Sequence, residues 1–382
     1  MRLLDAAASD LATHLARNGR VPWGRALVDD VREAGLTGRG GAGFPVWRKL
    51  SAVAEGSAPV VVANGAEGEP ASAKDHTLLV RAPHLVLDGL QLAAEAVRAT
   101  TAVVYVPEGL AAQAVRAALA ERAGWDALPV AVVVAPDYFV AGQESAVVAA
   151  VEGRQALPSD RLTLTVRSGV HGRPTLVQNV ETLAHVAQIA RYGPEWFRQC
   201  GTAEEPGTFL ATVSGSVRRG GVYEVPHGVP LGELLAQAGG PAGELRAVLV
   251  GGYHGTWVPA ADARIPLSRK ALGSLGAGVL VALDAAECGL AVASEVLTYL
   301  ARQSARQCGP CLNGLPALAR AMSDVVSGAR PEQVARLADL VERRGACHHP
   351  DGAARFARSS LAVFGDEIAC HLRGGCAARR TR

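Results

Sequence analysis

The chain has 382 residues, of which 49% are hydrophobic and 19% are charged, and its formal net charge is +2. This length and composition suit two or three folded domains and exclude an intrinsically disordered chain. There is no basic block and only 4% of the residues are aromatic, which argues against a nucleic-acid-binding surface, so small molecules and other proteins are the expected partners.

The first residues lack the uninterrupted apolar core of a secretory signal peptide. No stretch reaches the roughly 18 uncharged apolar residues expected of a membrane span. We therefore expect a cytoplasmic protein. Its seven cysteines should stay reduced in that compartment, and we expect metal ligands, catalytic groups or buried apolar residues among them rather than disulfides.

A glycine-rich run follows a helical lead-in over residues 1–34. It reads GLTGRGGAGFP over residues 35–45, with five glycines in its first nine positions. Glycine lets a backbone approach a ligand closely and aim several N–H groups at one anion, which is how a phosphate-binding loop is built. The same composition is also compatible with a mobile turn without a ligand.

The next segments alternate between strand and helix patterns. The apolar run 60–63 predicts a buried strand, and the polar turn 64–70 follows it directly. Beyond the turn we expect a helix over 78–98, a strand over 101–106, a helix over 110–123 and a strand over 130–135. This alternation predicts a parallel sheet, and such sheets bind their ligands where strands end in polar turns.

The second half of the chain changes character twice. Residues 142–146 open a helix, and residues 174–182 lead into another with an apolar face. A polar loop at 200–207 then marks a domain boundary. Short strands indicate a small β-rich domain at 208–214, 221–225, 247–250 and 278–283. Helical periodicity predicts a compact helical bundle from segments 291–303, 314–326, 331–343 and 355–372.

Two cysteines three residues apart, Cys308 and Cys311, are followed by Cys347. This spacing suits thiolate ligation of a tetrahedral metal or of an iron–sulfur cluster. A redox dithiol is the alternative, but such a pair usually opens a helix after a strand, whereas helical sequence surrounds this one.

The other cysteines are harder to interpret. Cys200 and Cys288 are isolated in the sequence, and we expect them to be small buried apolar residues. Cys370 and Cys376 near the tail either have no role or reach the metal site.

Four glutamates and one lysine are candidates for nucleotide contacts. A carboxylate repels phosphate, but it accepts hydrogen bonds from a ribose or an amide. Glu67 and Glu69 therefore either face a nucleotide or form a solvated pair, while Glu144 and Glu181 either bind a ligand or cap helices. Lys49 either pairs with a phosphate or lies in water.

Five sequence blocks, taken in chain order, resemble one family. The blocks at 35–45, 64–70, 142–146, 178–183 and 308–311 are similar to the flavin-bearing NADH dehydrogenase subunit of respiratory complex I. The same module occurs in NAD-linked hydrogenases and formate dehydrogenases. The resemblance covers nearly the whole chain, and five ordered motifs are far more specific than any one alone.

The resemblance implies three domains. A Rossmann-like α/β domain over residues 1–203 would bind FMN and NAD(H). A small β-grasp domain of the soluble-ligand-binding kind would occupy residues 204–288. A helical-bundle domain over residues 289–382 would hold an iron–sulfur cluster.

The resemblance also implies which residues bind the cofactors. Gly38 belongs to the glycine loop, and the residues expected to line FMN are Arg39, Gly40, Gly41, Ala42, Lys49, Asn64, Gln178, Asn179 and Thr182. Those expected to face the nicotinamide nucleotide are Phe44, Glu67, Glu69 and Glu144. The cluster ligands are Cys308, Cys311 and Cys347.

The cluster motif departs from the family pattern, because Ala305 stands where the family has its first cysteine. Three family ligands remain, so the cluster is [3Fe–4S], is [4Fe–4S] completed by another group, or is absent. The candidate substitute ligands are His349, Cys370 and Cys376. An imidazole ligand tends to raise the potential of a cluster.

The nucleotide positions also depart from the family. Ala66 replaces the aspartate that would bond FMN, and this version of the acidic turn is more like the corresponding subunit of Rnf-type ferredoxin:NAD oxidoreductases, which also hold FMN. Ala52 replaces an aromatic residue expected to stack on adenine. Phe139 replaces a tyrosine and Gln143 a glutamate, which weakens the expected preference for NADH.

The resulting hypothesis is a flavin and iron–sulfur oxidoreductase. Hydride would pass from NADH to FMN, and single electrons would leave through the cluster to a ferredoxin-like protein, a thioredoxin-like [2Fe–2S] protein or a quinone-linked membrane reductase. Such partners would hold the chain at the inner face of the cell membrane.

Two alternatives come from other classes. One is a non-catalytic paralogue that serves as an interaction scaffold. The other is a zinc protein with a site built from Cys308, Cys311, Cys347 and His349. Neither needs the glycine loop.

Overall fold

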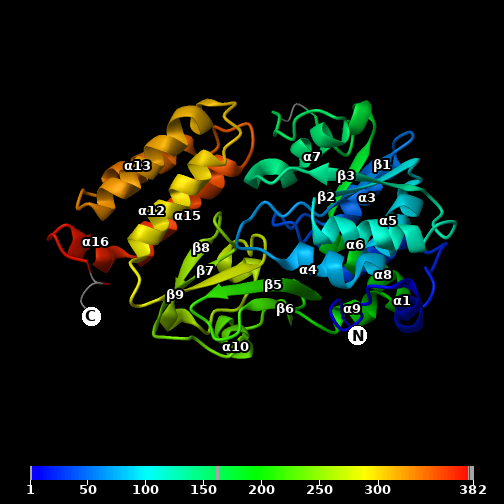
Figure 1. Ribbon diagram of the computed structural model, residues 1–382, viewed down its shortest axis with the longest axis horizontal. Coiled ribbons are helices and arrows are strands. Elements are labelled where there is room, and N and C mark those ends of the chain that lie inside the picture. The colour runs from blue at the N-terminus through cyan, green and yellow to red at the C-terminus, as the bar shows by residue number, and fades with distance from the viewer. Residues whose placement is uncertain (1, 161–162, 377, 379–382) are drawn as a thin grey trace. The chain divides into compact units, whose positions relative to one another are not determined.

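The computed structural model describes residues 2–160, 163–376 and 378 (Figure 1). These residues form two compact units. The first runs to Ala211 and takes in Val222–Val229, and the second comprises Thr212–Gly221 and the described residues from Pro230 onward. The predicted domain limits at 203/204 and 288/289 remain predictions, since this division into two units does not test them.

The first unit is built on a parallel sheet in the strand order β3-β2-β1-β4. Its strands are β1 (Val60–Asn64), β2 (Thr101–Pro107), β3 (Val130–Ala135) and β4 (Thr175–Asn179). The predicted parallel sheet and its first three strands are confirmed. Strand β4 was not predicted, because its residues were expected only to lead into a helix.

Both faces of this sheet are buried. Val61 and Ala63 belong to the large core cluster on one face, together with side chains of α5 and α8, while Val60 and Val62 pack in a second cluster with Val147 of α7 on the other. Since successive strand residues point to opposite faces, an uninterrupted apolar strand indicates a sheet covered on both sides. This explains the run of valines in β1.

Helices surround the sheet of the first unit. They are α1 (Leu11–Asn18), α2 (Leu27–Ala34), α3 (Val46–Ala54), α4 (Lys74–Arg81), α5 (Pro83–Val97), α6 (Leu110–Glu121), α7 (Glu144–Val151), α8 (Val180–Tyr192) and α9 (Pro194–Arg198). The single helix expected over 78–98 was wrong. Two helices, α4 and α5, meet there at Ala82, because the residue before a proline disfavours helical geometry.

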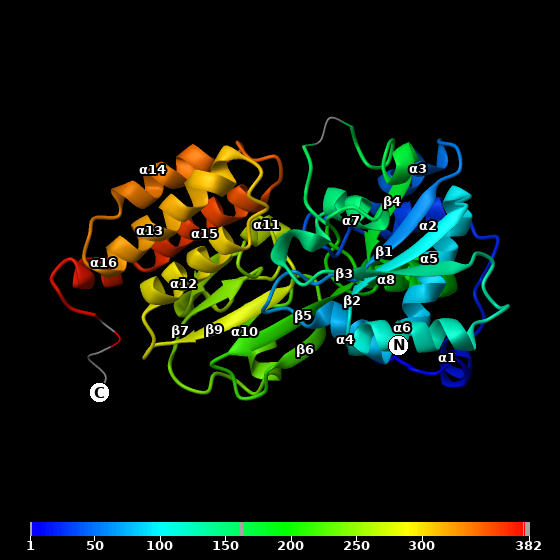
Figure 2. The same cartoon turned by 45° about the horizontal axis from the view of Figure 1, so that its top comes forward.

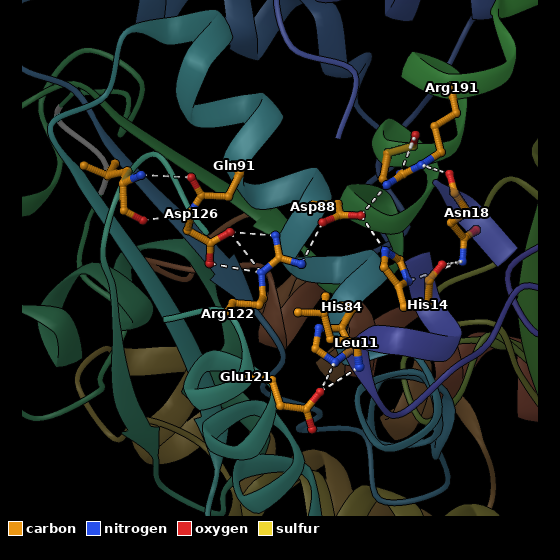
Figure 3. Close-up of polar contacts among 12 residues, drawn as sticks. Leu11, His14, Asn18, His84, Asp88, Gln91, Glu121, Arg122, Asp126 and Arg191 are labelled. Atoms are coloured by element: carbon orange, nitrogen blue, oxygen red, sulfur yellow. Dashed lines mark hydrogen bonds and ion pairs between the residues drawn. The ribbon is translucent and has the colours of Figure 1, made fainter. Parts of the chain in front are cut away.

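A buried carboxylate joins four of these helical segments (Figure 3). Asp88 of α5 contacts Arg122 at the end of α6 (2.8 Å), His14 of α1 (2.7 Å) and Arg191 of α8. Burial alone would raise the pKa of Asp88, but the hydrogen bond from His14 and the charges of Arg191 and Arg122 lower this pKa to about 2. The ion network therefore fixes how these helices pack.

Replacing Asp88 with asparagine should lower the free energy of unfolding by about 3–5 kcal/mol at pH 7, since it leaves buried arginines without their charge partner. A carboxylate with a lowered pKa stabilises the fold above its ordinary pKa of 3.8, and this contribution is lost as the pH falls through about 2. Urea unfolding midpoints of wild type and variant should therefore converge towards pH 2. In the matched control Asp29→Asn, which alters a surface pair that is 65% exposed at Asp29, the midpoint should barely move. Equal midpoints for wild type and Asp88→Asn at pH 7 would contradict the assignment.

The second sheet has the strand order β6-β5-β9-β7-β8. Its strands are β5 (Thr208–Gly215), β6 (Gly221–Pro226), β7 (Leu245–Val250), β8 (Thr256–Pro259) and β9 (Val279–Asp284). Strands β5 and β9 are parallel, whereas β7 runs antiparallel to both β9 and β8. Four of these strands were predicted. Strand β8 and the short helices α10 (Leu231–Gln237) and α11 (Arg269–Leu272) were not.

The rest of the second unit is a helical bundle, as predicted, in which α13, α14 and α15 lie side by side (Figure 2). Its elements are α12 (Gly289–Arg302), the π-helical turn η4 (Pro310–Gly314), α13 (Leu315–Val326), α14 (Glu332–Val341), α15 (His349–Val363) and α16 (Gly365–His371). The helix expected over 355–372 was misplaced, because α15 begins at His349 and ends before Gly365. None of the described helices has the length and apolar character that a membrane crossing requires.

Candidate functional site

The first unit has a topological switch point between β1 and β4. From β1 the chain moves outward to β2 and β3, and then returns to β4 on the other side of β1. The last residues of the two central strands, Asn64 and Asn179, pair in register. In open parallel sheets the crevice outside the carboxyl ends of the strands at such a point is the ligand site.

The glycine loop lies against this point. Thr37 and Pro45 form a β-bridge, and the Gly38 N–H donates to the Phe44 carbonyl at 2.9 Å, which closes the loop. The Arg39 N–H donates to Thr182 Oγ1 at 2.9 Å, and a Cβ added at Gly40 would lie 3.5 Å from the Asn179 Cβ. The loop therefore packs beside the end of β4 and the first turn of α8.

The geometry of the loop requires glycine at two positions. Gly41 has a φ of +102° and Gly43 a φ of +60°, which L side chains rarely adopt. Phe44 follows and is 46% exposed. The chain thus presents backbone N–H groups rather than side chains over much of the loop, as a phosphate-binding loop does.

The Arg39 side chain has a different role from its backbone. It is 6% exposed, and its Nη1 donates to the carbonyl and hydroxyl oxygens of Thr37 at 3.1 and 3.0 Å. Its Nε lies 4.0 Å from Glu181. The guanidinium therefore braces the base of the loop, and anion binding by the loop falls to its backbone.

Glu67 in the acidic turn caps a helix. Its carboxylate accepts from the N–H groups of Asp75 and His76, each at 3.1 Å, and from the hydroxyl of Ser72. These two backbone groups belong to the first turn of α4, where N–H groups lack partners within the helix. The predicted nucleotide contact of Glu67 remains a prediction, but the carboxylate already positions α4.

The acidic turn is also fixed to the turn that precedes α7. The Asn64 amide donates to the Gly142 carbonyl at 2.9 Å. A Cβ at Gly68 would lie 2.1 Å from the Phe139 carbonyl oxygen, so only glycine permits this approach. Glu69 beside it is almost buried. The turns at the carboxyl ends of β1 and β3 thus form one packed rim.

Two predicted site residues form an ion pair on this rim. Lys49 Nζ lies 3.2 Å from Glu144 Oε1, and both side chains are 22% exposed. Gln143 accepts from the N–H groups of Ser145 (2.8 Å) and Ala146 (3.1 Å), and so caps α7. The residue that replaces a family glutamate therefore has a structural use, and Glu144, which was considered as a helix cap, instead pairs with Lys49.

A buried charge network, which the sequence analysis missed, lies beneath the glycine loop. Lys74 Nζ contacts Asp75 (2.7 Å), Glu181 (2.9 Å) and the Asn179 side-chain oxygen (3.3 Å). The Asn179 amide in turn donates to Asp75 at 2.6 Å. This cluster holds the end of β4 against the start of α4. Lysine is scarce in the chain, with only three copies, and this scarcity is the one sequence signal that pointed to Lys74.

The network shifts the pKa values of its members in opposite senses of charge. Burial alone would lower the pKa of Lys74, but the carboxylates of Asp75, Glu181 and Glu67 raise it, so the ammonium stays charged. Burial raises the pKa of Asp75 to about 7, although Lys74 opposes the shift. The floor of the crevice therefore gains a proton as the pH falls through neutrality.

The crevice residues fit a flavin phosphate and ring. Gln178, at the end of β4, is buried, and its Nε2 has no hydrogen-bond partner among the described residues. An unpartnered buried donor is costly unless a ligand satisfies it. With the glycine loop and the N-terminus of the 13-residue helix α8 beside it, the crevice offers both an anion site and a polar edge.

The second unit contains the predicted cluster cysteines. Cys308 and Cys311 have their Sγ atoms 3.5 Å apart, and Cys311 and Cys347 are buried. Burial, with Cys308 and Cys347 close by, raises the pKa of Cys311 to about 11. Such a thiol becomes a thiolate only when a cation compensates its charge, and a metal or a cluster is the usual compensating group.

Arginines surround Cys311. A cavity of about 530 Å³ is lined by Cys311 together with Arg302, Arg306 and Arg320. Cationic side chains offset the negative charge of several thiolates. The donor set and its surroundings therefore fit an iron–sulfur cluster with three cysteine ligands.

The structure bears on the substitute ligands in two ways. His349 has Nε2 2.8 Å from the Leu300 carbonyl and Nδ1 3.1 Å from His254, so both of its ring nitrogens already have neighbours. Cys288, expected to be an isolated apolar residue, instead lies 3.3 Å from His371 Nε2. That expectation was wrong because the contact comes from a helix that is distant in sequence.

Comparison with known families matches all three regions of the chain. The Nuo51 FMN-binding domain matches residues 31–188, the SLBB domain residues 210–252, and the NADH-ubiquinone oxidoreductase-F iron-sulfur binding region residues 291–371. The predicted order of an α/β region, a soluble-ligand-binding region and a helical region is thereby confirmed.

Individual proteins are similar over most of the chain. The second F-type NADH-quinone oxidoreductase protein of Rhizobium meliloti is 32% identical, across 91% of this chain and 88% of that protein. The F-type NADH-quinone oxidoreductase protein of Streptomyces coelicolor is 31% identical, across 92% and 84%. A chain of the air-oxidized NAD+-reducing [NiFe]-hydrogenase matches with a TM-score of 0.86 and 32% identity, across 91% of this chain and 62% of that one.

Proposed function

The chain belongs to the family of the F-type subunits of NADH-quinone oxidoreductases, and from this premise we propose that it is an NADH dehydrogenase that oxidises NADH and delivers single electrons to a protein partner. FMN, when bound, supplies the conversion of a two-electron hydride into single electrons, and an iron–sulfur cluster supplies their onward conduction. The protein contributes binding, orientation and charge.

One observation carries the proposal: the glycine loop packs on Asn179 and Thr182 at the switch point between β1 and β4. We propose that the loop N–H groups from Gly38 to Phe44 hold the flavin phosphate, next to the N-terminus of α8. Gln178 offers its unpartnered Nε2 to a flavin ring acceptor. Lys49 and Glu144 lie on the rim, where the nicotinamide nucleotide would enter.

In the second unit Cys308, Cys311 and Cys347 would hold the cluster. Because Ala305 provides no thiol, we propose either a [3Fe–4S] cluster or a [4Fe–4S] cluster whose fourth iron has a non-cysteine ligand. The arginines beside Cys311 compensate thiolate and cluster charge, and they present a positive surface to an acidic electron acceptor.

The relatives are named as subunits, so we propose that this chain also works in a complex. A ferredoxin-like or thioredoxin-like [2Fe–2S] protein is the acceptor we favour, because it takes one electron at a time. We propose a cytoplasmic location, at the membrane surface where a quinone-linked reductase is the final acceptor.

Replacing Gly40 with valine should lower FMN affinity by at least about tenfold. The fold tolerates a Cβ there, because the nearest atom would be Asn179 Cβ at an ordinary 3.5 Å, while a flavin phosphate in the loop would lose its space. A loss of about 1.4 kcal/mol of binding energy corresponds to that factor. The measurement is flavin per chain after gel filtration, with circular dichroism to check the fold.

The matched control is Gly365→Val, at a position where a Cβ would meet nothing within 4 Å. It should keep the wild-type flavin content. Full flavin occupancy in a folded Gly40→Val protein would refute the placement of FMN at this loop.

A further inference from the structure

A second group of metal-ligating side chains lies in the helical bundle, apart from the predicted cluster cysteines. Cys288, His371 and Cys376 place one ligand atom each within 4.8 Å of one another, and each of these residues is partly buried. Cys288 directly precedes α12, His371 ends α16, and Cys376 follows it. Residues that are distant in sequence therefore converge on one point.

This group is distinct from the cluster site. Cys288 precedes the first residue of α12, whereas Cys308 follows the last one. A helix of 14 residues is about 21 Å long. The two groups of thiols therefore belong to opposite ends of α12, and one metal centre cannot use both.

The histidine is prepared for a metal. His371 Nδ1 lies 2.7 Å from the Val326 carbonyl. A carbonyl only accepts hydrogen bonds, so Nδ1 carries the proton and Nε2 presents its lone pair. Nε2 is the atom that lies 3.3 Å from Cys288 Sγ. Ligating histidines in proteins are typically oriented by such a bond from the other ring nitrogen to a carbonyl or carboxylate.

The neighbouring carboxylate does not need the Cys288 thiol. Glu367 accepts from Arg246 Nη1 (2.7 Å) at one oxygen and from the Leu290 N–H (3.2 Å) at the other. Its second oxygen is also 3.4 Å from Cys288 Sγ. The thiol has one proton and faces two acceptors, Glu367 and His371. A cation that replaces this proton would be bound by the sulfur and by His371 Nε2 together.

The distances suit zinc. A tetrahedral zinc with Zn–S of about 2.3 Å and Zn–N of about 2.0–2.1 Å keeps its ligand atoms about 3.5–3.8 Å apart. The observed 3.3 Å between Cys288 and His371 needs only a small adjustment. A hollow of about 920 Å³, lined by all three residues, gives an ion and a water access to the site.

We propose that Cys288, His371 and Cys376 bind one Zn²⁺, with a water from the hollow as the fourth ligand. Two thiolates balance the charge of the ion, and the thiol protons are released to solvent on binding. The metal ties the segment after α16 to the start of α12 and the end of α13. This proposal does not depend on the flavin or on the iron–sulfur cluster.

The test is zinc analysis of the full-length chain with zinc X-ray absorption spectroscopy, which iron does not mask. Wild type should contain about one zinc per chain, with two sulfur ligands and the remainder nitrogen or oxygen. Cys288→Ala and Cys376→Ala should each weaken zinc binding by at least about tenfold, since even changes to groups behind the ligands cost 10–100-fold. Their iron content should be unchanged.

The matched control is Cys200→Ala, a single thiol of the first unit, which should keep its zinc. The spectroscopy on wild type does not depend on variants that fold poorly. A zinc with three sulfur ligands, zinc lost from Cys311→Ala but kept in Cys288→Ala, or a wild type that takes up no added Zn²⁺ would each overturn the proposal.

Discussion

Replacing Cys311 with alanine is expected to remove the iron from the purified protein while leaving its flavin in place. The change leaves two of the three family cysteine ligands, Cys308 and Cys347, and two thiolates do not hold an iron–sulfur cluster. The flavin crevice belongs to the other compact unit. Iron, acid-labile sulfide and FMN per chain are the measured quantities.

The kinetics of the Cys311→Ala protein should separate two steps. NADH should still bleach the flavin absorption, while reduction of a one-electron protein acceptor should be largely lost. Cys200→Ala should retain iron, flavin and both activities. Unchanged iron content in Cys311→Ala would contradict the assignment of the cluster to these cysteines, and loss of flavin together with iron would contradict the independence of the two sites.

Replacing Lys74 with methionine is expected to lower the free energy of unfolding by about 3–5 kcal/mol and to deplete the flavin. The change removes the cation that Asp75 and Glu181 share inside the protein, and breaking a buried pair from one side leaves an uncompensated charge. Asn179, at the floor of the crevice, also loses a contact. The measurements are urea unfolding and FMN per chain.

The loss should depend on pH in a defined direction. Burial already raises the pKa of Asp75 to about 7, and removing Lys74 takes away the charge that opposes this shift. Asp75 is then largely neutral at pH 6 and unpaired at pH 8, so the Lys74→Met protein should be more destabilised at pH 8. A larger loss at pH 6 would contradict the network.

Two further variants test the network. Lys270→Met makes the same substitution at an exposed position of α11 and should change stability by no more than about 0.5 kcal/mol. Adding Asp75→Asn to Lys74→Met removes the unpaired carboxylate and should recover stability, with a coupling of about 0.5–3 kcal/mol. Strict additivity of the two changes would show that the side chains do not interact.

The sequence was sufficient for the parts of the fold that depend on local pattern. The valine run of β1 and the alternation with helices predicted a parallel sheet, because apolar strands of this kind must be covered on both faces. Strand β4 has polar residues at its end, Gln178 and Asn179, and it passes directly into α8. Its strand character comes from pairing with β1, which a local pattern does not reveal.

The parts of the site that were missed depend on contacts between distant segments. Asp75 meets Asn179 across 104 residues, and Cys288 meets His371 across 83. Nothing in the sequence next to these residues distinguishes them from surface charges or buried thiols. Arg39 shows the converse, since it was expected to line FMN through a motif, and its guanidinium instead contacts Thr37 at the base of the loop.

The most direct test of the central claim is to purify the chain without oxygen and record its absorption spectrum, with iron and sulfide analysis, before and after NADH is added. We expect flavin bands and a broad iron–sulfur absorption that both bleach with NADH, and the iron count then separates a three-iron from a four-iron cluster. A colourless protein, or a coloured one that NADH leaves unchanged, would contradict the proposal that this chain oxidises NADH.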